Sequence, residues 1–298
     1  MRFLYSLARF RFLLRLLGMA LAAYVFVGAY LTIFQRDFIY LPDTTPPSLA
    51  GLNVAGMEEI IVPVTEPDGT GLLLKSWYHP PRAPDNPVVM YFQGNGGNIG
   101  WRNEKIRFFV NAGYGVFMVG YRGYGANPGH PTEAGLRRDA AHARLILDNL
   151  LRRGQRQSMR RPRVVCYGES LGAGLCIQIA ASVPDFALLL LEAPFKSLAD
   201  VAAHRYQLYP LNILSWLLKD KFDSIHKIAA VRTPILFLHG QKDAITPVEH
   251  SYALMAAANE PKEGWFPEDG GHNDLSKFGS HERAREFIDK YLPPKVKP

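Results

Sequence analysis

The amino-acid sequence predicts an α/β fold built on a mostly parallel sheet of eight strands, with helices on both faces and a short helical lid. Strand-like apolar runs alternate with helix-like runs over most of the chain. The first two strand-like runs are joined by Pro67-Asp68-Gly69 without an intervening helix, which predicts an antiparallel hairpin at the start of the sheet. With 298 residues, 48% of them hydrophobic, the chain is long enough to bury one large core.

The elements follow from the pattern of apolar residues. The expected strands span residues 59–64, 72–79, 88–92, 116–121, 164–167, 187–191, 235–238 and 264–266. The expected helices span residues 103–111, 132–151, 171–182, 247–257 and 281–291. About forty residues separate the sixth strand from the seventh, and the lid is expected there, at about 196–231.

The N-terminal 40 residues are predicted to be a membrane anchor and residues 41–298 a separate α/β domain. Nineteen residues without a charge, 16–34, would form a helix of roughly 28 Å, close to the hydrocarbon thickness of a bilayer. A cleavable signal peptide ending at Ala20-Leu21-Ala22 is the alternative, but the apolar run continues for twelve residues beyond it. Residues 42–55 contain several Pro and Thr residues and are expected to form a linker or an extended wrap.

The distribution of positive charge argues for a membrane and against nucleic acid as the partner. The net charge is +7, but residues 1–36 hold five arginines and no acidic residue, which leaves 29 basic against 27 acidic residues, or +2, elsewhere. Four arginines precede the apolar run and one follows it, which predicts a cytoplasmic N-terminus and an α/β domain on the periplasmic or extracellular side. Six arginines within 152–163 are expected to form a solvated loop, with anionic lipid headgroups as the alternative contact.

The chain contains two cysteines, Cys166 and Cys176. Neither their number nor their spacing suggests a disulfide framework or a zinc site, so both are expected to be buried thiols. No metal site is predicted.

Gly168-Glu169-Ser170-Leu171-Gly172 follows a strand-like run and begins a helix-like run. This is G-x-S-x-G in the setting of a nucleophile elbow, where a serine lies at the apex of a strained turn between two glycines that allow strand and helix to approach. The alternative is a glycine-rich turn with an incidental serine. If the motif is an elbow after the fifth strand, the sheet has the order of an α/β-hydrolase and Ser170 is the nucleophile.

A glycine-rich loop, Gln93-Gly94-Asn95-Gly96-Gly97-Asn98, follows the strand at 88–92 and is the candidate oxyanion site. In such enzymes one donor comes from this loop and the other from the residue after the nucleophile. The backbone N–H groups of Asn95 and Leu171 are therefore the expected donors. A phosphate-binding loop is disfavoured because the sequence lacks G-x-x-x-x-G-K-[ST].

Asp243 and His272 are the candidate acid and base. Asp243 follows the strand at 235–238, at an edge where open α/β sheets place functional groups, although it could instead cap the turn before the next helix. Glu249 is a weaker candidate for the acid. His272 lies in a glycine-flanked loop before the last helix, and the chain order Ser, Asp, His is that of α/β-hydrolases.

These motifs, together with Tyr121-Arg122-Gly123-Tyr124-Gly125 and His239-Gly240-Gln241-Lys242-Asp243, resemble those of single-pass membrane α/β-hydrolases of the Bem-like and "α/β-hydrolase-domain-containing" type. Such proteins are often grouped with serine aminopeptidase-like hydrolases, and the resemblance covers about residues 30–295. It implies Ser170, Asp243 and His272 as the triad and esterase, lipase or acyl-protein thioesterase chemistry without a cofactor. The chain departs from the family pattern at Gln93, where His is usual, and at Gly120, where Asp is usual.

The predicted lid is apolar, and this bears on the substrate. Two readings are open: packing of a small helical cap, or a wall for an acyl chain, for which Leu211, Leu214 and Trp216 are the candidate substrate-binding residues. The second reading predicts a serine hydrolase acting on ester or thioester bonds of an acylated or lipid-like substrate. A serine peptidase of the same fold and a catalytically silent membrane-anchored scaffold are the alternatives.

Overall fold

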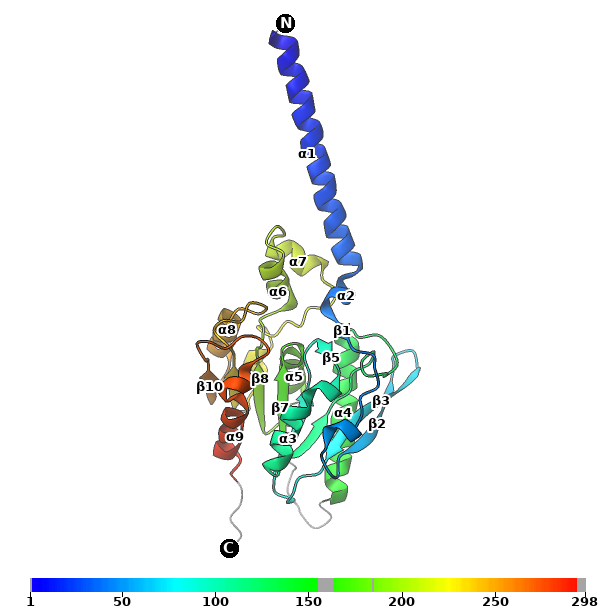
Figure 1. Cartoon of the computed structure of the whole chain (residues 1–298), viewed down its shortest axis with the longest axis vertical. Coiled ribbons are helices and arrows are strands. Elements are labelled where there is room, and N and C mark those ends of the chain that lie inside the picture. Colours follow the sequence, from blue (N-terminus) through cyan, green and yellow to red (C-terminus); the bar gives the residue numbers. More distant parts are fainter. Residues whose placement is uncertain (1, 155–162, 184, 294–298) are drawn as a thin grey trace. The chain divides into compact units, whose positions relative to one another are not determined.

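The computed structural model describes residues 2–154, 163–183 and 185–293 and divides the chain into two compact units, Met1–Ile39 and Tyr40–Pro298 (Figure 1). The first unit consists of helices α1 (Arg2–Ile33) and α2 (Gln35–Ile39). Within α1, the 25 residues Arg9–Ile33 are long and apolar enough to cross a membrane, with a mean hydropathy of 2.0 over their most apolar 18-residue stretch. A signal sequence has the same properties, so both readings of this segment remain compatible with its length and composition.

The second unit is organised around one eight-stranded sheet with the strand order β10-β9-β8-β7-β4-β6-β3-β2. All neighbours are parallel except β2 with β3 and β3 with β6, so the predicted antiparallel hairpin and mostly parallel sheet are confirmed. Strands β4, β8 and β9 are buried at every position, as expected of strands covered on both faces. The strands are β2 (Glu58–Thr65), β3 (Gly71–His79), β4 (Val88–Phe92), β6 (Gly115–Met118), β7 (Val164–Glu169), β8 (Leu188–Glu192), β9 (Ile235–Leu238) and β10 (Lys262–Trp265).

Helices cover both faces of the sheet. On one face, α3 (Asn103–Asn111) and α9 (Ser280–Tyr291) pack over a core that includes Tyr91 and Tyr167. Cys166, the preceding residue on β7, points to the opposite face, because side chains alternate along a strand. That face carries α5 (Leu171–Ser182), which packs against α4 (Glu133–Gly154). The remaining helices are α6 (Leu198–Arg205), α7 (Leu211–Leu217), α8 (Glu249–Ala257) and the 3₁₀ turns η1 (Ala50–Leu52), η2 (Ile99–Arg102), η3 (Ile228–Ala230) and η4 (Leu275–Phe278).

The prediction of two free thiols is wrong. Cys166 on β7 and Cys176 on α5 form a disulfide with an S–S distance of 2.09 Å and a Cα–Cα distance of 6.0 Å. The sharp turn at the elbow sends α5 back across β7, which brings together two residues that are ten positions apart in the sequence. Both cysteines are buried, as expected.

The stretch expected to be a linker or wrap contributes a short strand. Strand β1 (Leu41–Pro42) pairs in parallel with β5 (Gly96–Gly97), which lies within the glycine-rich loop after β4. The expectation of a solvated loop at 152–163 falls largely on residues that the structure does not describe. Of its six arginines, Arg156, Arg160 and Arg161 lie outside the described residues.

Candidate active site

Ser170 lies at the sharp turn between β7 and α5, with a positive φ of 52° and a ψ of −110°. The two flanking glycines are sterically required. A Cβ atom on Gly168 would lie 2.3 Å from the carbonyl oxygen of Gly172, and one on Gly172 would lie 2.0 Å from the carbonyl oxygen of Phe92. The Ser170 amide donates a hydrogen bond of 2.8 Å to the carbonyl oxygen of Glu192, so the strained backbone is held by its neighbour strand β8.

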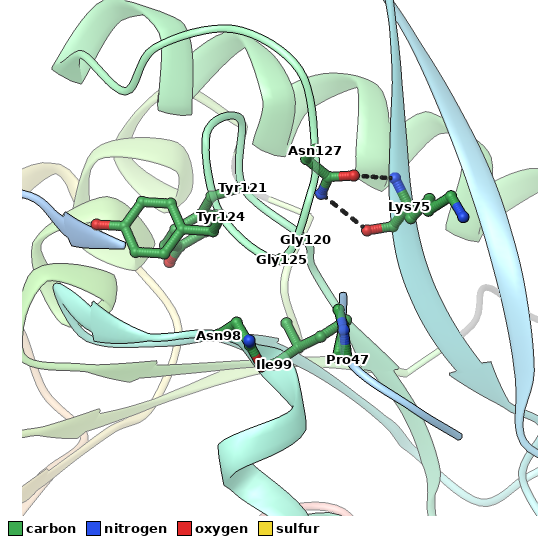
Figure 2. Close-up of a pocket in the computed structure, with 9 residues that line it drawn as sticks. All are labelled: Pro47, Lys75, Asn98, Ile99, Gly120, Tyr121, Tyr124, Gly125 and Asn127. Carbon is green, nitrogen blue, oxygen red and sulfur yellow. Dashed lines mark hydrogen bonds between the residues drawn. The ribbon is translucent and has the colours of Figure 1, made fainter. Parts of the chain in front are cut away.

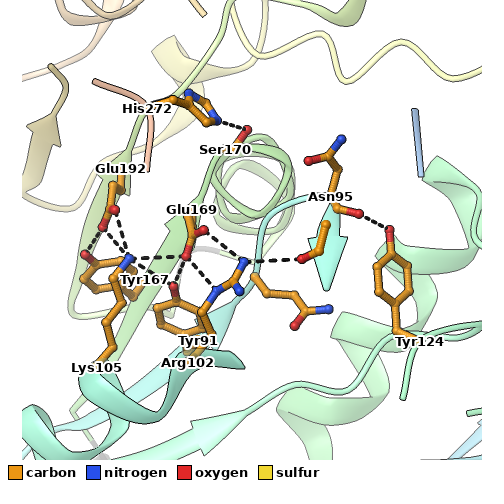
Figure 3. A network of polar contacts seen from close by, with 12 residues as sticks. Tyr91, Asn95, Arg102, Lys105, Tyr124, Tyr167, Glu169, Ser170, Glu192 and His272 are labelled. Carbon is orange, nitrogen blue, oxygen red and sulfur yellow. Dashed lines mark hydrogen bonds and ion pairs between the residues drawn. The ribbon is translucent and has the colours of Figure 1, made fainter. Parts of the chain in front are cut away.

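The structure brings Ser170, His272 and Asp243 together. His272 Nε2 lies 3.2 Å from Ser170 Oγ (Figure 3), and its Nδ1 lies 2.6 Å from Asp243 Oδ2. The two readings of Asp243 prove compatible, since its Oδ1 accepts the backbone N–H groups of Ile245 and Thr246 while Oδ2 faces His272. One carboxylate thus organises the turn and orients the imidazole.

A second histidine supports Asp243. His239 is fully buried, and its Nε2 lies 3.0 Å from Asp243 Oδ2 and 2.8 Å from the carbonyl oxygen of Thr246. Because both neighbours are acceptors, Nε2 carries the proton, and Nδ1 can accept from the Ser251 hydroxyl at 2.6 Å. Burial by itself would raise the pKa of Asp243, but the hydrogen bonds from His239 and His272 hold it well below its usual range.

Sequence reasoning assigned no role to His239, although the residue directly follows a buried strand and shares a turn with Asp243. Two features of the sequence point to a role for His239 beside Asp243: its position at a strand end and its distance of four residues from the candidate acid.

The glycine-rich loop lies directly against the elbow. A Cβ atom on Gly94 would lie 3.7 Å from Ser170 Cβ, and one on Gly172 would lie 2.7 Å from the Gln93 carbonyl oxygen. Leu171 is the first residue of α5, so its amide has no acceptor within the helix. The two segments expected to donate to an oxyanion are therefore neighbours.

Gln93, where the family usually has His, is fully buried, and neither polar atom of its side chain has a partner among the described residues. Its backbone carbonyl oxygen accepts a hydrogen bond of 2.9 Å from the Tyr121 hydroxyl. Gln93 thus supports the loop through its backbone.

Beneath the elbow lies a buried network of two carboxylates and two cations (Figure 3). Arg102 Nη2 lies 3.0 Å from Glu169 Oε1, and Lys105 Nζ lies 3.2 Å from Glu169 Oε2 and 2.8 Å from Glu192 Oε2. The four side chains are between 5% and 14% exposed. The network is completed by two hydroxyl groups that donate to Glu169 and Glu192, those of Tyr91 and Tyr167 respectively.

The charges in this network stabilise one another. Burial alone would raise the pKa of Glu169, but Lys105 and Arg102 lower it below its usual range. For Lys105, burial acts to lower the pKa, but Glu169 and Glu192 raise it well above its usual value. The network fixes Glu169, which precedes Ser170, and Glu192, whose carbonyl oxygen accepts the Ser170 amide. Glu169 lies within G-x-S-x-G, but no sequence motif marks its partners Arg102, Lys105 and Glu192.

A small pocket lies beside the glycine-rich loop that follows β4 (Figure 2). Asn127 closes one side, since its Nδ2 donates to the Lys75 carbonyl oxygen and its Oδ1 accepts the Lys75 amide. Gly120 also borders the pocket, and a Cβ atom there would lie 1.8 Å from the Lys75 carbonyl oxygen, so an Asp cannot occupy this position without a backbone shift. None of the candidate catalytic residues lines this pocket, whose lining residues are Pro47, Lys75, Asn98, Ile99, Gly120, Tyr121, Tyr124, Gly125 and Asn127.

The three candidate substrate-binding residues lie on α7 and differ in exposure. Leu214 is 8% exposed, whereas Leu211 is 46% and Trp216 82% exposed. Leu214 packs inward, and Trp216 presents its ring to the surroundings. Among the residues that the structure describes, no group of three or more His, Cys, Asp or Glu side chains is arranged to hold a metal ion.

The sequence of this chain is similar to a known protein family and to several relatives. The family described as serine aminopeptidase, S33, matches residues 83–227. An uncharacterized protein of Mycobacterium tuberculosis is 37% identical over 86% of this chain and 87% of its own. The alpha/beta hydrolase domain-containing protein WAV2 of Arabidopsis thaliana is 30% identical over 90% of this chain and 92% of its own.

Solved structures are similar in fold. An esterase of Pyrococcus furiosus superposes with a TM-score of 0.64 at 18% identity, covering 85% of this chain and 98% of the esterase. A monoacylglycerol lipase of Paleococcus ferrophilus superposes with a TM-score of 0.51 at 19% identity, covering 73% of this chain and 99% of the lipase. At these identities the likeness shows the α/β-hydrolase fold.

Proposed function

Because this chain belongs to the family of α/β-hydrolase domain-containing proteins, we propose that it is a serine hydrolase that cleaves carboxylic ester or thioester bonds. The observation that carries the proposal is the hydrogen-bonded series from Ser170 through His272 to Asp243, with Ser170 on a strained elbow. Geometry of this kind identifies a triad irrespective of sequence position.

The proposed reaction is a two-step acyl transfer. Ser170 Oγ attacks the acyl carbonyl carbon while His272 Nε2 takes the hydroxyl proton, and Asp243 stabilises the imidazolium that forms. The carbonyl oxygen becomes an oxyanion, for which the amides of Asn95 and Leu171 are the proposed donors. When the tetrahedral intermediate collapses, His272 returns the proton to the leaving alcohol or thiol. Water then attacks the acyl-enzyme while His272 takes one of its protons. Collapse of the second tetrahedral intermediate releases the acid, and His272 returns that proton to Ser170 Oγ.

A fluorophosphonate probe tests the nucleophile. We expect covalent labelling of the wild-type protein and none of Ser170→Ala. The matched control is Ser182→Ala, since Ser182 is an exposed serine at the far end of the same helix, where its hydroxyl bonds the Gln178 carbonyl. Equal labelling of wild type and Ser170→Ala contradicts the assignment.

The exposed apolar side chains of residues 208–216 support an acylated or lipid-like substrate. Leu208 is 81% exposed and Trp216 82%, in a segment of the chain that also contributes the 46% exposed Leu211. Contiguous exposed apolar surface marks sites of contact with ligands, proteins or membranes, and the proposal assigns these side chains to such a surface. Hydrolysis of p-nitrophenyl acetate and palmitate compares the two substrate classes. A higher kcat/KM for the long chain supports the proposal, and a strong preference for acetate contradicts it.

A serine peptidase of the same fold is the second candidate, because the matched family is described as serine aminopeptidase. Aminoacyl p-nitroanilides distinguish the two, since a peptidase cleaves these amide bonds whereas an esterase leaves them largely intact. A silent scaffold would show neither ester hydrolysis nor labelling by the probe.

We also propose that α1 anchors the protein with the catalytic unit on the outer side of the membrane. The positive charge before the apolar run favours this orientation, and the Cys166–Cys176 disulfide is compatible with an oxidising compartment. Protease added to intact spheroplasts should digest the catalytic unit. A unit that stays protected until the membrane is opened contradicts the outward orientation.

A further inference from the structure

The first residues of the catalytic unit hold the loop that carries the proposed oxyanion donor. Strand β1 pairs with β5, where Leu41 is opposite Gly96 and Pro42 is opposite Gly97. The Leu41 amide donates to the Asn95 carbonyl oxygen at 3.0 Å, and the Asp43 amide donates to the Gly97 carbonyl oxygen at 3.1 Å. A segment that follows the membrane-length helix and the short helix α2 in sequence is thus a strand partner of the loop.

Asp43 makes the side-chain part of this contact. Its Oδ2 accepts hydrogen bonds of 3.0 Å from Asn98 Nδ2 and 3.0 Å from Trp101 Nε1, which lie at and beyond the end of the loop. Its Oδ1 accepts the Thr45 amide at 2.8 Å. Its carbonyl oxygen accepts the Gly125 amide at 2.8 Å, so Asp43 also joins the loop to the turn that follows β6.

The loop needs such external support because its own sequence gives it little rigidity. Gly94, Gly96 and Gly97 have no side chains to pack, and glycine loses more conformational freedom on folding than other residues. At Gly97, where φ is +79°, a Cβ atom would lie 2.8 Å from the Trp101 ring, so the indole covers the backbone directly. The Tyr124 hydroxyl donates to the Asn95 carbonyl oxygen at 2.8 Å from the other side (Figure 3).

We propose that Asp43 is a positioning residue for the oxyanion site: by bonding Asn98, Trp101 and the loop backbone, it holds the Asn95 amide beside Ser170. This inference rests on the proposed serine-hydrolase function. Asp43 acts through the loop and contacts no reacting atom. A displacement of about 1 Å at a catalytic group can cost on the order of 100-fold in rate, and loss of one oxyanion donor costs about 10²–10³-fold.

The chain offers a matched control. Asp68 forms the same local turn as Asp43, with its Oδ1 accepting the amide of the residue two positions later, Thr70, at 2.9 Å. Asp68 lies in the exposed hairpin between β2 and β3. The two local sequences are alike, since a threonine stands two positions after the aspartate in both Asp68-Gly69-Thr70 and Asp43-Thr44-Thr45. Asp68→Ala therefore removes an equivalent local hydrogen bond without touching the loop.

The test compares Asp43→Ala, Asp43→Asn and Asp68→Ala in the full-length protein in mild detergent, using a p-nitrophenyl ester. Active sites are counted with the fluorophosphonate probe, so that unfolded protein does not enter kcat. We expect kcat of Asp43→Ala to fall about 10- to 100-fold with KM unchanged. Asp43→Asn should recover part of the loss, because its amide oxygen can still accept from Asn98 and Trp101. Asp68→Ala should match the wild type.

A second substrate separates positioning from a general structural defect. In a thionoester the developing charge lies on sulfur, a weaker hydrogen-bond acceptor, so the oxyanion donors contribute less to its hydrolysis. Asp43→Ala should therefore lose more activity on the ester than on the matching thionoester. If Asp43→Ala proves unstable, Trp101→Phe removes the Nε1–H donor together with part of the indole, keeps an aromatic ring at this position, and should shift the ester-to-thionoester ratio in the same direction.

A kcat per active site within twofold of wild type and an unchanged ester-to-thionoester ratio in both Asp43→Ala and Trp101→Phe overturn the positioning role. Labelling of Ser170 in the same variants would show that the serine-hydrolase proposal survives. A wild-type protein that the probe does not label at all overturns that proposal, and this inference with it.

Discussion

The buried network beneath the elbow allows a quantitative prediction for Lys105→Met. The ammonium group lies 2.8 Å from Glu192 Oε2 and 3.2 Å from Glu169 Oε2, and the lysine side chain is 13% exposed. Methionine fills a similar volume without the charge, so the substitution isolates the electrostatic contribution. It leaves Arg102, which pairs with Glu169, as the remaining cation of this network.

The expected loss follows from the burial of both partners. Two unit charges 4 Å apart attract by about 4 kcal/mol at an effective dielectric constant of 20, and desolvation offsets part of this. Removing one partner of a buried pair costs about 3–5 kcal/mol, because the other charge stays buried without compensation. Since whole domains are stable by only about 5–15 kcal/mol, Lys105→Met should lose a large fraction of the free energy of unfolding.

Urea unfolding of the full-length protein in mild detergent measures this loss. The control is Lys75→Met, which breaks a pair with Glu59 at 3.1 Å in which the side chains are 53% and 38% exposed. Exposed pairs contribute about 0–1 kcal/mol, so this variant should remain close to wild type. The charge-balanced double variant Lys105→Met/Glu192→Gln should recover about 1–3 kcal/mol relative to Lys105→Met.

The pH dependence has a definite sign. The lowered pKa of Glu169 means that its ionised form stabilises the fold above about pH 4.3, its unfolded value, and that this stability is lost as the pH falls through the folded pKa. In Lys105→Met the Glu169 carboxylate keeps Arg102 but loses the attraction of Lys105, so its pKa rises and protonation relieves the part of the charge that is no longer compensated. The difference from wild type should therefore shrink as the pH falls from 7 towards 5. Equal losses for Lys105→Met and Lys75→Met, or a difference independent of pH, would refute the reasoning.

Two further predictions concern the elbow and the acid. Gly172→Ala should abolish labelling of Ser170 by the fluorophosphonate probe, because the added Cβ would lie 2.0 Å from the Phe92 carbonyl oxygen. The control is Gly18→Ala, where the added Cβ meets nothing within 4 Å beyond its own stretch of helix. Normal labelling of Gly172→Ala would contradict the steric argument. His239→Leu removes one donor to Asp243 Oδ2 and should lower kcat about tenfold or more at constant KM, whereas His239→Gln, which keeps an N–H, should lose less. Unchanged kinetics in His239→Leu would show that the remaining donors to Asp243 suffice.

The sheet and the candidate site were largely predictable because each depends on a local pattern. A buried parallel strand is apolar at nearly every position, as in β4 and β8, and such runs are easy to find. The elbow requires glycine at fixed positions around the serine, so Gly168 and Gly172 mark it in the sequence. Although 102 residues separate Ser170 from His272, the fixed chain order of the motifs identifies the pairing.

The supporting contacts could not be predicted, because they join common residue types across long distances without a motif. Lys105 and Glu192 are 87 residues apart, and Asp43 and Asn98 are 55 residues apart. Nothing distinguishes such a lysine or aspartate from one on the surface until the fold is known. The disulfide escaped prediction for a related reason: whether residues on a strand and the following helix meet depends on the angle at the turn between them.

The position of these supports indicates how the elbow can remain strained. The Ser170 backbone is held from three directions: by the Glu192 carbonyl oxygen on β8, by the ion-paired Glu169 that precedes it, and by the loop after β4 that lies against Gly172. The loop in turn is held by β1. A positive φ at a non-glycine residue persists only where the surrounding structure over-determines it. The charged network and the β1 strand therefore hold Ser170, the proposed nucleophile, and the neighbouring loop in one arrangement. Such preorganisation is the condition for stabilising an oxyanion without reorganisation.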